Sequence, residues 1–327
     1  MNNKYILNSS NVHKNYQIIS LIGSGGMGSV YLVRSIHNPA NIYALKYYNG
    51  AMNSTNAMRF RSETNLLKKV KSKYLPTFYE FYEDKMEMFY VMEYIEGETL
   101  SNLIDKKGRL ESRRAINYML QINEGIGELH TLNVIHRDIK SQNIILRNNQ
   151  EIKIVDLGIS IAPESQRLTK TNAIVCSPYY AAPEINHKIS KQTDIYALGI
   201  LFYKMLTGNY PFKGKDEYET IKMHKERDFP NIRDSIDVPW SIYNILAKAT
   251  HKDYQKRYQT VWDFNKDLRE CLKPEHKLDL PINIKTLQKM KPKSNFFASN
   301  KIWITFVFIL IVILIFLVVF ILYLKVY

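Results

Sequence analysis

The chain has 327 residues, of which 46% are hydrophobic and 23% are charged, a balance typical of globular proteins and not of disordered chains. Its two cysteines, Cys176 and Cys271, lie far apart and cannot form a disulfide framework, so we expect a reducing compartment. The net charge of +14 could indicate nucleic-acid binding, but six lysines lie in a tail with no acid after Asp279. The remaining excess is spread along the chain, and we expect no nucleic-acid partner.

Residues 1–15 are polar and rich in asparagine, and we expect them to be flexible. Up to residue 94, short β-rich runs alternate with one helical pattern. The expected strands are Tyr16–Ile22, Val30–Ser35, Ile42–Tyr48 and Phe89–Tyr94. The expected helix is Ala57–Val70, in which Phe60, Glu63, Leu67 and Val70 fall on one face.

Helical patterns dominate from Gly97 to residue 272. The expected helices are Ser112–Leu132, Asp194–Thr207, Ser241–Lys248 and Val261–Leu272. The second of these is apolar on most faces, which predicts a buried helix. Residues 273–301 contain prolines and many lysines, and they are expected to form a basic juxtamembrane linker.

Residues 302–324 form an apolar run without a charged side chain. Its 23 residues would span roughly 34 Å as a helix, against about 30 Å of hydrocarbon in a bilayer. A buried core helix is the alternative, but the length and the apolarity on every face favour a transmembrane helix. Most of the nearby lysines precede the run, so the positive-inside rule predicts a single-pass protein of the cell membrane, with residues 1–301 cytoplasmic. Residues 325–327 would form a short external tail, without an extracellular sensor.

A glycine-rich segment lies between the first two expected strands, with the sequence Gly23-Ser24-Gly25-Gly26-Met27-Gly28. Dinucleotide-binding units share this type of motif, but there a helix follows the glycines. Here a strand follows, and Lys46 lies in the next one. Backbone N–H groups in such a hairpin can approach phosphates closely because no Cβ intervenes.

Residues 136–143 read His-Arg-Asp-Ile-Lys-Ser-Gln-Asn, and Asp156-Leu157-Gly158 follows after a short apolar stretch. One loop–strand–loop unit thus carries two acids, a lysine and an amide. These groups can hold a nucleotide's phosphates, its metal ions and an attacking hydroxyl together. Any single Asp or Asn could be an ordinary turn residue, but the complete spacing argues against coincidence.

Together these motifs, over residues 16–272, resemble the eukaryotic-like protein kinases. The resemblance is closest to the bacterial membrane-anchored Ser/Thr kinases. It implies an α+β, bilobal fold, with a β-rich N-lobe over 16–94 and a helical C-lobe over 97–272, followed by one transmembrane helix. It also implies ATP and Mg²⁺ as cofactors, with Mn²⁺ as a substitute. The implied partners are proteins with Ser or Thr acceptors and other copies of this chain, phosphorylated in trans.

The resemblance assigns roles to individual residues. Asp138 would be the catalytic base, and Lys140 would steady the γ-phosphate. Lys46 would pair with the α- and β-phosphates and would be oriented by Glu63, although Glu63 could also be a surface acid. The metal ligands would be Asn143 and Asp156. The implied ATP-binding residues are Ile22, Gly23, Ser24, Gly25, Gly26, Met27, Gly28, Val30, Ala44, Lys46, Met92, Glu93 and Ile95.

Among these, Met92 matches the gatekeeper, and the backbones of Glu93 and Ile95 would bind adenine. Val30 and Ala44 would pack on the adenine ring, or they could be ordinary core residues.

The segment from Asp156 to Glu184 resembles an activation segment. Within it, Thr169 and Thr171 match a phosphorylated pair, or they could be solvated loop residues. Arg137 would pair with the added phosphate, and Ser177 would contact Asp138 and Lys140. Two structural contacts are also implied, between Arg257 and Glu184 and between Asp194 and the backbone of the catalytic loop.

Three positions depart from the family's usual pattern. Leu157 replaces a phenylalanine, and Ser141 replaces a frequent proline in the catalytic loop. Cys176 replaces a frequent glycine, and its effect on the local loop is open.

Two other functions compete with an active protein kinase. A membrane-tethered pseudokinase scaffold would tolerate loss of Lys46, Asp138, Asn143 or Asp156, yet all four are present. A small-molecule phosphotransferase of similar fold is disfavoured by the activation segment and by Arg257.

Overall fold

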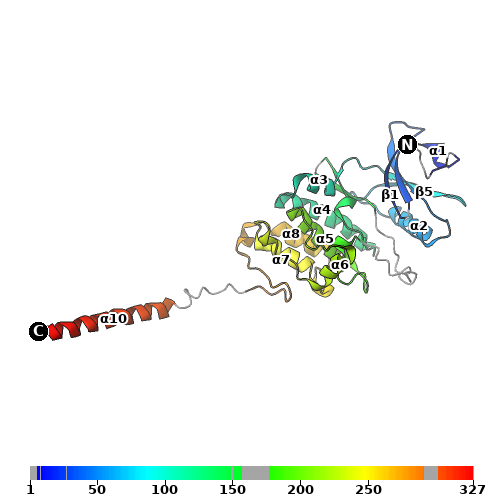
Figure 1. The fold of residues 1–327 in the computed structure, drawn as a ribbon. Coiled ribbons are helices and arrows are strands. Elements are labelled where there is room, and N and C mark those ends of the chain that lie inside the picture. The colour runs from blue at the N-terminus through cyan, green and yellow to red at the C-terminus, as the bar shows by residue number, and fades with distance from the viewer. Residues whose placement is uncertain are drawn as a thin grey trace. The chain divides into compact units, whose positions relative to one another are not determined.

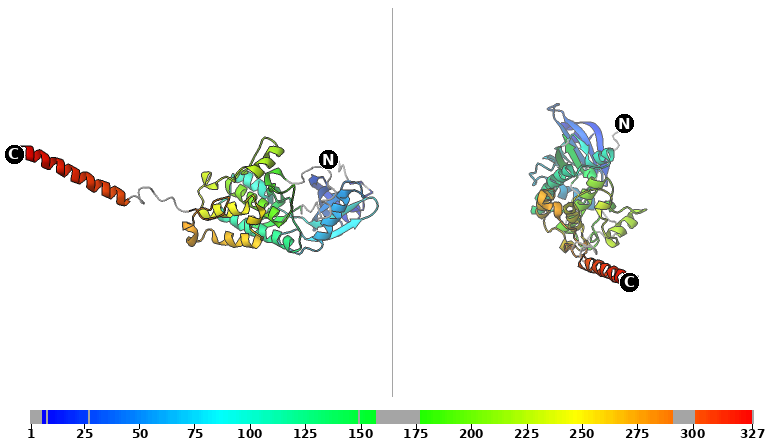
Figure 2. Two further views of the ribbon diagram at one scale, coloured as in Figure 1. Left: turned by 90° about the horizontal axis from the view of Figure 1, so that it is seen from below. Right: turned by 90° about the vertical axis from the view of Figure 1, so that its left-hand side faces the viewer.

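The computed structural model describes residues 6–7, 9–26, 28–148, 150–156, 177–290 and 301–326, and within the last helix it describes the side chains of residues 305–321. The chain divides into two compact units, Met1–Leu287 and Gln288–Tyr327. In the first unit the strands gather at one end and most helices at the other (Figures 1 and 2). This arrangement is the bilobal protein kinase fold that the sequence predicts.

A five-stranded antiparallel sheet, in the order β1-β2-β3-β5-β4, forms the N-lobe (Figure 1). Its strands are β1 (Tyr16–Gly25), β2 (Gly28–Ser35), β3 (Ile42–Tyr48), β4 (Phe78–Glu83) and β5 (Met88–Glu93). Lys46 pairs with Val30 on one side and with Tyr90 on the other. Because side chains alternate along a strand, these three side chains share one face of the sheet.

Helix α2 (Thr55–Leu67) begins after Ser54, whose side chain accepts a hydrogen bond from the Ala57 amide. It buries Phe60, Glu63 and Leu67, three of the four residues that the sequence places on its inner face. The Phe60 ring lies 5.2 Å from the ring of Tyr90, which ties the helix to the strand face that carries Lys46. The helix ends before Val70, three residues earlier than predicted.

The segment before β1 is more ordered than its composition predicts. Helix α1 (Val12–Asn15) follows Ser10, whose hydroxyl donates to Glu87 Oε2 at 2.6 Å. The backbone N–H of Asn11 donates to Glu87 Oε1 at 2.7 Å, and the Val12 side chain is buried. The prediction of flexibility is therefore wrong for residues 10–15, because these polar groups find a buried carboxylate as their partner.

The C-lobe is mainly helical, with a small antiparallel sheet in the order β6-β7-β8. Its elements are β6 (Glu98–Thr99), α3 (Leu100–Lys107), α4 (Ser112–Thr131), β7 (Ile144–Arg147), β8 (Glu151–Ile154), α5 (Lys191–Thr207), α6 (Glu217–Glu226), α7 (Trp240–Ala249) and α8 (Val261–Glu270). Helix α5 is buried along almost its whole length, as predicted. It contacts the loop between α4 and β7 and thereby supports it.

The beginning of the expected linker is docked on the C-lobe. The Asn244 side chain on α7 donates to the carbonyl of Leu280 at 3.0 Å and accepts from the N–H of Ile282 at 2.9 Å. The His251 ring lies 3.0 Å from the carbonyl of Lys285. Residues up to Leu287 therefore belong to the first compact unit, so the predicted linker is docked on the C-lobe over this part.

Helix α10 (Lys301–Val326) lies in the second unit. Its apolar side chains from Phe306 to Ile321 are all exposed. Among the described residues, no helix is long and apolar enough to cross a membrane.

Candidate active site

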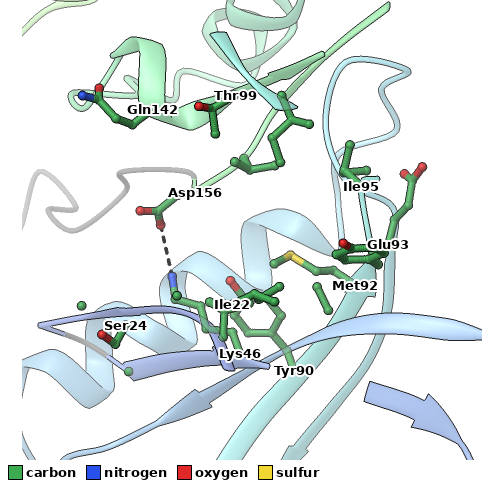
Figure 3. Close-up of a pocket in the computed structure, with 18 of the residues that line it drawn as sticks. Ile22, Ser24, Lys46, Tyr90, Met92, Glu93, Ile95, Thr99, Gln142 and Asp156 are labelled. Atoms are coloured by element: carbon green, nitrogen blue, oxygen red, sulfur yellow. Dashed lines mark hydrogen bonds and ion pairs between the residues drawn. The ribbon is translucent and has the colours of Figure 1, made fainter. Parts of the chain in front are cut away.

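A cleft of about 390 Å³ opens between strands β1, β2, β3 and β5 on one side and β7 with the residues that follow β8 on the other. Figure 3 shows Lys46 and Asp156 facing each other across it, with Met92, Glu93 and Ile95 along one wall. Every residue predicted to bind ATP lines this cleft except Met27, which lies outside the described residues. Its lining also contains Tyr90, Tyr94, Thr99, Gln142, Ile145 and Val155, which the sequence analysis did not single out.

Lys46 lies between two carboxylates. Its Nζ donates to Glu63 Oε1 at 2.8 Å and Oε2 at 3.0 Å, and to Asp156 Oδ1 at 3.3 Å. Burial lowers the pKa of Lys46, but the interactions with Glu63, Tyr90 and Asp156 together outweigh burial, and the net pKa lies well above the ordinary value. The same lysine lowers the pKa of Asp156. The lysine is thus charged and fixed, and it faces the cleft beside an ionised acid.

Glu63 is almost completely buried, and burial raises its pKa despite the bonds from Lys46. It has a further donor that the sequence did not indicate, because the Tyr90 hydroxyl lies 2.7 Å from Glu63 Oε1. Tyr90 is itself buried and lies with its ring centroid 5.9 Å from Lys46 Nζ. Glu63 is therefore a buried charge with partners from two strands, and the surface-acid alternative is excluded.

The loop before β7 assembles polar groups around Asp138. Lys140 Nζ donates to Asp138 Oδ2 at 2.5 Å, and Asn143 Nδ2 donates to the same oxygen at 3.2 Å and to the Asp138 carbonyl at 2.9 Å. The Ser177 hydroxyl donates to Asp138 Oδ1 at 3.0 Å. The contact between Ser177 and Asp138 that the resemblance implies is thus present. An acid with both oxygens engaged is held in one orientation.

Backbone conformation is strained at two site residues, one in the loop before β7 and one just after β8. Arg137 has φ 68° and Asp156 has φ 61°, the left-handed region that non-glycine residues rarely adopt. The Asp194 carboxylate accepts from the N–H groups of His136 at 2.8 Å and Arg137 at 2.9 Å. This confirms the implied contact between Asp194 and the catalytic loop, and it stabilises the strained turn.

Ser141, which departs from the family's usual pattern, lies in a buried polar network. Its hydroxyl accepts from Lys204 Nζ at 3.1 Å and from the Tyr180 hydroxyl at 3.3 Å. Lys204 also donates to the Tyr210 hydroxyl at 2.9 Å. The serine thus links the catalytic loop to α5 and to the segment after Ser177.

The expected pair of Arg257 and Glu184 is confirmed. Both terminal nitrogens of the arginine donate to the two carboxylate oxygens at 2.7 Å, and the arginine side chain is fully buried. Such a bidentate pair fixes Glu184, at the end of the predicted activation segment.

The glycines beside the cleft differ in what the fold requires of them. A Cβ on Gly28 would lie 2.2 Å from the Tyr47 carbonyl oxygen, so packing alone demands glycine there. A Cβ on Gly23, Gly25 or Gly26 would meet no protein atom within 4 Å. The protein's own packing therefore leaves these three positions free, next to a space that a ligand could enter.

Several predicted positions lie outside the described residues: Leu157, Thr169, Thr171 and Cys176. Within the described residues, no cluster of three or more His, Cys, Asp or Glu side chains could hold a metal ion.

Residues 16–273 match the family model of the protein kinase domain. This is most of the chain, which therefore belongs to the protein kinase domain family. The chain is 36% identical over 259 residues to Serine/threonine-protein kinase PrkC of Bacillus subtilis, covering 78% of this chain and 40% of the relative. It is 30% identical over 258 residues to Probable serine/threonine-protein kinase PknB of Lactococcus lactis, covering 77% of this chain and 41% of the relative.

This chain thus spans about two fifths of the length of these relatives. A solved structure of Rad53 in complex with AMP-PNP has a TM-score of 0.67 and 21% identity, covering 80% of this chain and 66% of that one. This likeness bears on the fold alone.

Proposed function

We propose that this protein is an active serine/threonine protein kinase that transfers the γ-phosphate of ATP to protein hydroxyls. The observation that supports the proposal is that two groups of polar side chains, one on each side of the catalytic centre that the sequence predicts, are both complete. Lys46 is ion-paired with Glu63 and Asp156, and Asp138 is held by Lys140 and Ser177. A pseudokinase scaffold would not need both groups to be complete.

The cleft suits a nucleotide. Gly23, Gly25 and Gly26 leave room where backbone N–H groups could approach phosphates. Val30 and Ala44 line the wall on which adenine would pack, and the backbones of Glu93 and Ile95 would bind its edge. The Glu93 side chain is occupied elsewhere, since it accepts from Lys153 at 2.8 Å.

Asn143 and Asp156 would hold Mg²⁺, for which hard oxygen donors are suited. When bound, the ion would neutralise charge on the phosphate oxygens. One carboxylate and one amide suffice for this family of sites, because phosphates and water supply the other ligands.

Asp138 would orient the acceptor hydroxyl and accept its proton as the oxygen–phosphorus bond forms. The bond from the γ-phosphorus to the bridging oxygen then breaks, and ADP leaves. Lys140 would supply positive charge to the γ-phosphate, and Lys46 would supply it to the α- and β-phosphates. Ser177 next to Asp138 favours serine or threonine as the acceptor.

A soluble fragment of residues 1–290 with γ-labelled ATP and a generic protein substrate tests the proposal. We expect label on protein that depends on Lys46 and Asp138. If the fragment binds ATP but transfers no label, the pseudokinase function is correct. Transfer to a small molecule and never to protein would favour the small-molecule phosphotransferase.

We also propose regulation by phosphorylation in trans at Thr169 or Thr171. Arg137 supports this, because its Nε and one terminal nitrogen are buried without a hydrogen-bond partner among the described residues. Burial lowers its pKa, so the unpaired cation is costly. A phosphate, with about −1.5 to −2 charges, would satisfy it and order the segment.

Finally, we propose that residues 302–324 anchor the protein in the cell membrane, with the kinase domain, residues 16–272, in the cytoplasm. The uncharged sequence, the helical conformation of α10 and the exposure of its apolar side chains support this. If a protein that ends at Lys291 still pellets with membranes after a high-salt wash, the anchor lies elsewhere.

A further inference from the structure

We propose that Tyr90 is a positioning residue for phosphate transfer, which holds the Glu63 carboxylate against Lys46 and thereby keeps helix α2 engaged with the sheet. The inference rests on the proposed kinase function and assigns a role to a residue that no kinase motif in this sequence includes.

The contact is a direct bond between strand and helix. The Tyr90 hydroxyl on β5 donates to Glu63 Oε1 on α2 at 2.7 Å, the same oxygen that accepts from Lys46 at 2.8 Å. Both Tyr90 and Glu63 are only 1% exposed. Burial raises the pKa of Tyr90 well above its ordinary value, so the hydroxyl keeps the proton that it donates.

Register in the sheet explains why Tyr90 can reach this oxygen. Tyr90 pairs directly with Lys46 across β3 and β5, so both side chains leave the sheet on the face that α2 covers. Figure 3 shows the Tyr90 side chain beside that of Lys46 at the cleft wall. The Phe60 ring, one turn before Glu63 on α2, packs against Tyr90 at 5.2 Å and fixes the ring.

Lys46 and Tyr90 both donate to Glu63, but they differ in their other contacts. Lys46 is shared between Glu63 and Asp156, and in the proposed reaction it also contacts phosphates. Its hold on Glu63 therefore depends on what occupies the cleft. The Tyr90 hydroxyl donates its hydrogen bond to Glu63, and this bond does not involve the nucleotide. Tyr90 can thus keep α2 in place while Lys46 contacts the phosphates.

A simple packing role for Tyr90 makes a different prediction. If only the ring mattered, phenylalanine would replace it without loss, because the contact with Phe60 would remain. The decisive change is therefore Tyr90→Phe in the full-length protein, which removes the hydroxyl alone.

Tyr258→Phe is the matched control. Tyr258 is also buried, and its hydroxyl donates to the Asp267 carboxylate at 2.8 Å. That pair lies in the C-lobe, where Tyr258 stacks on Phe264 of α8. The two variants lose the same kind of bond, but only Tyr90→Phe should affect α2.

Three quantities are measured on wild type and both variants: kcat, KM for ATP, and amide hydrogen exchange of residues 55–67. A hydrogen bond to a buried charge corresponds to a factor of about ten or more in the equilibrium that it supports. We expect Tyr90→Phe to lower kcat about tenfold with a smaller change in KM, and to speed exchange in α2. Tyr258→Phe should leave kcat, KM and amide exchange in α2 unchanged.

A decrease in kcat of less than about threefold, or unchanged exchange in α2, would overturn the proposal. Equal losses of kcat in both variants would overturn it as well, because that result indicates general destabilisation. If wild type transfers no phosphate, the proposed kinase function fails, and the exchange measurement alone then decides whether Tyr90 holds α2.

Discussion

Asp138 is the residue whose surroundings define its chemistry most sharply. Both of its carboxylate oxygens accept side-chain hydrogen bonds, from Lys140 and Asn143 on one side and from Ser177 on the other. None of these partners belongs to the part of the cleft lined by the glycines. The acid should therefore matter for transfer and not for nucleotide binding.

We predict that Asp138→Asn lowers kcat by about 10²–10⁴-fold, the usual contribution of a general base, while the Kd for ATP stays within a factor of about two. The amide keeps the shape but cannot accept the proton. Nucleotide titration and a transfer assay test this, with Asp105→Asn, an exposed change on α3, as the control. Wild-type turnover by Asp138→Asn would remove Asp138 from the role of base.

His224 on α6 makes stability depend on pH. It is fully buried, and its Nδ1 lies 2.8 Å from the Tyr196 hydroxyl. Burial, reinforced by Lys252, lowers its pKa from 6.5 to about 3. The unfolded chain therefore takes up this proton first as the pH falls, and folding stability declines from about pH 6.5 down to about pH 3.

We predict that His224→Gln reduces the loss of unfolding free energy between pH 7.5 and pH 5 by about 2 kcal/mol, from the linkage of one proton over this window. Urea titrations at the two pH values measure it. His187→Gln, at an exposed position, should keep the wild-type dependence. An unchanged difference in His224→Gln would show that this ring does not titrate between the two states.

Charged and polar site residues could be predicted from sequence because they occur at a characteristic spacing along the chain, as Asp138 and Asn143 do. Tyr90, Ile145 and Val155 could not. An aromatic or aliphatic residue in a β-rich run is consistent with an ordinary core position. Only the register between β3 and β5, which brings Tyr90 opposite Lys46, gives it a polar partner.

Elements were predictable where their pattern was strong. Strand β3 has the predicted bounds, and α4 and α8 begin at the predicted residues. Strand β4 was not predicted, because glutamates at 80 and 83 interrupt its aromatic pattern. Helix α5 begins at Lys191, three residues before the predicted start, where the Thr193 hydroxyl accepts from the Ser190 N–H at 3.1 Å.

The predicted activation segment contains two threonines whose removal we expect to lower activity. Thr169→Ala combined with Thr171→Ala should remove most of the kinase activity while the fold persists, because Arg137 then lacks a partner anion. Activity, circular dichroism and mass spectrometry of the wild type are the measurements. Thr131→Ala, at the exposed end of α4, serves as the control.

A fully active wild-type preparation with both threonines unmodified would contradict this mechanism. Loss of folded signal in the double variant would instead assign the threonines a structural role.

Two truncated forms of the protein distinguish the effect of the C-terminal region on solubility from its effect on stability. A protein that ends at Lys291 should be soluble and as stable as the full first unit. One that ends at Lys273 should be less stable by about 1–3 kcal/mol, because Asn244 and His251 lose backbone partners at residues 280–285. Denaturant titration of the two fragments measures the difference. Equal stabilities would mean that the docked residues add nothing to the fold.

Docking of residues 279–287 also limits how far the enzyme can reach. If α10 is held in a bilayer, only residues 288–300 remain as a tether, which extends at most about 45 Å at roughly 3.5 Å per residue. A tether that started at residue 273 would reach about twice as far. The shorter tether would then confine the catalytic cleft to a thin layer beneath the lipid. Within that layer, the proposed kinase would encounter targets attached to the same surface, including a second copy of this chain, at a much higher local concentration than freely diffusing ones.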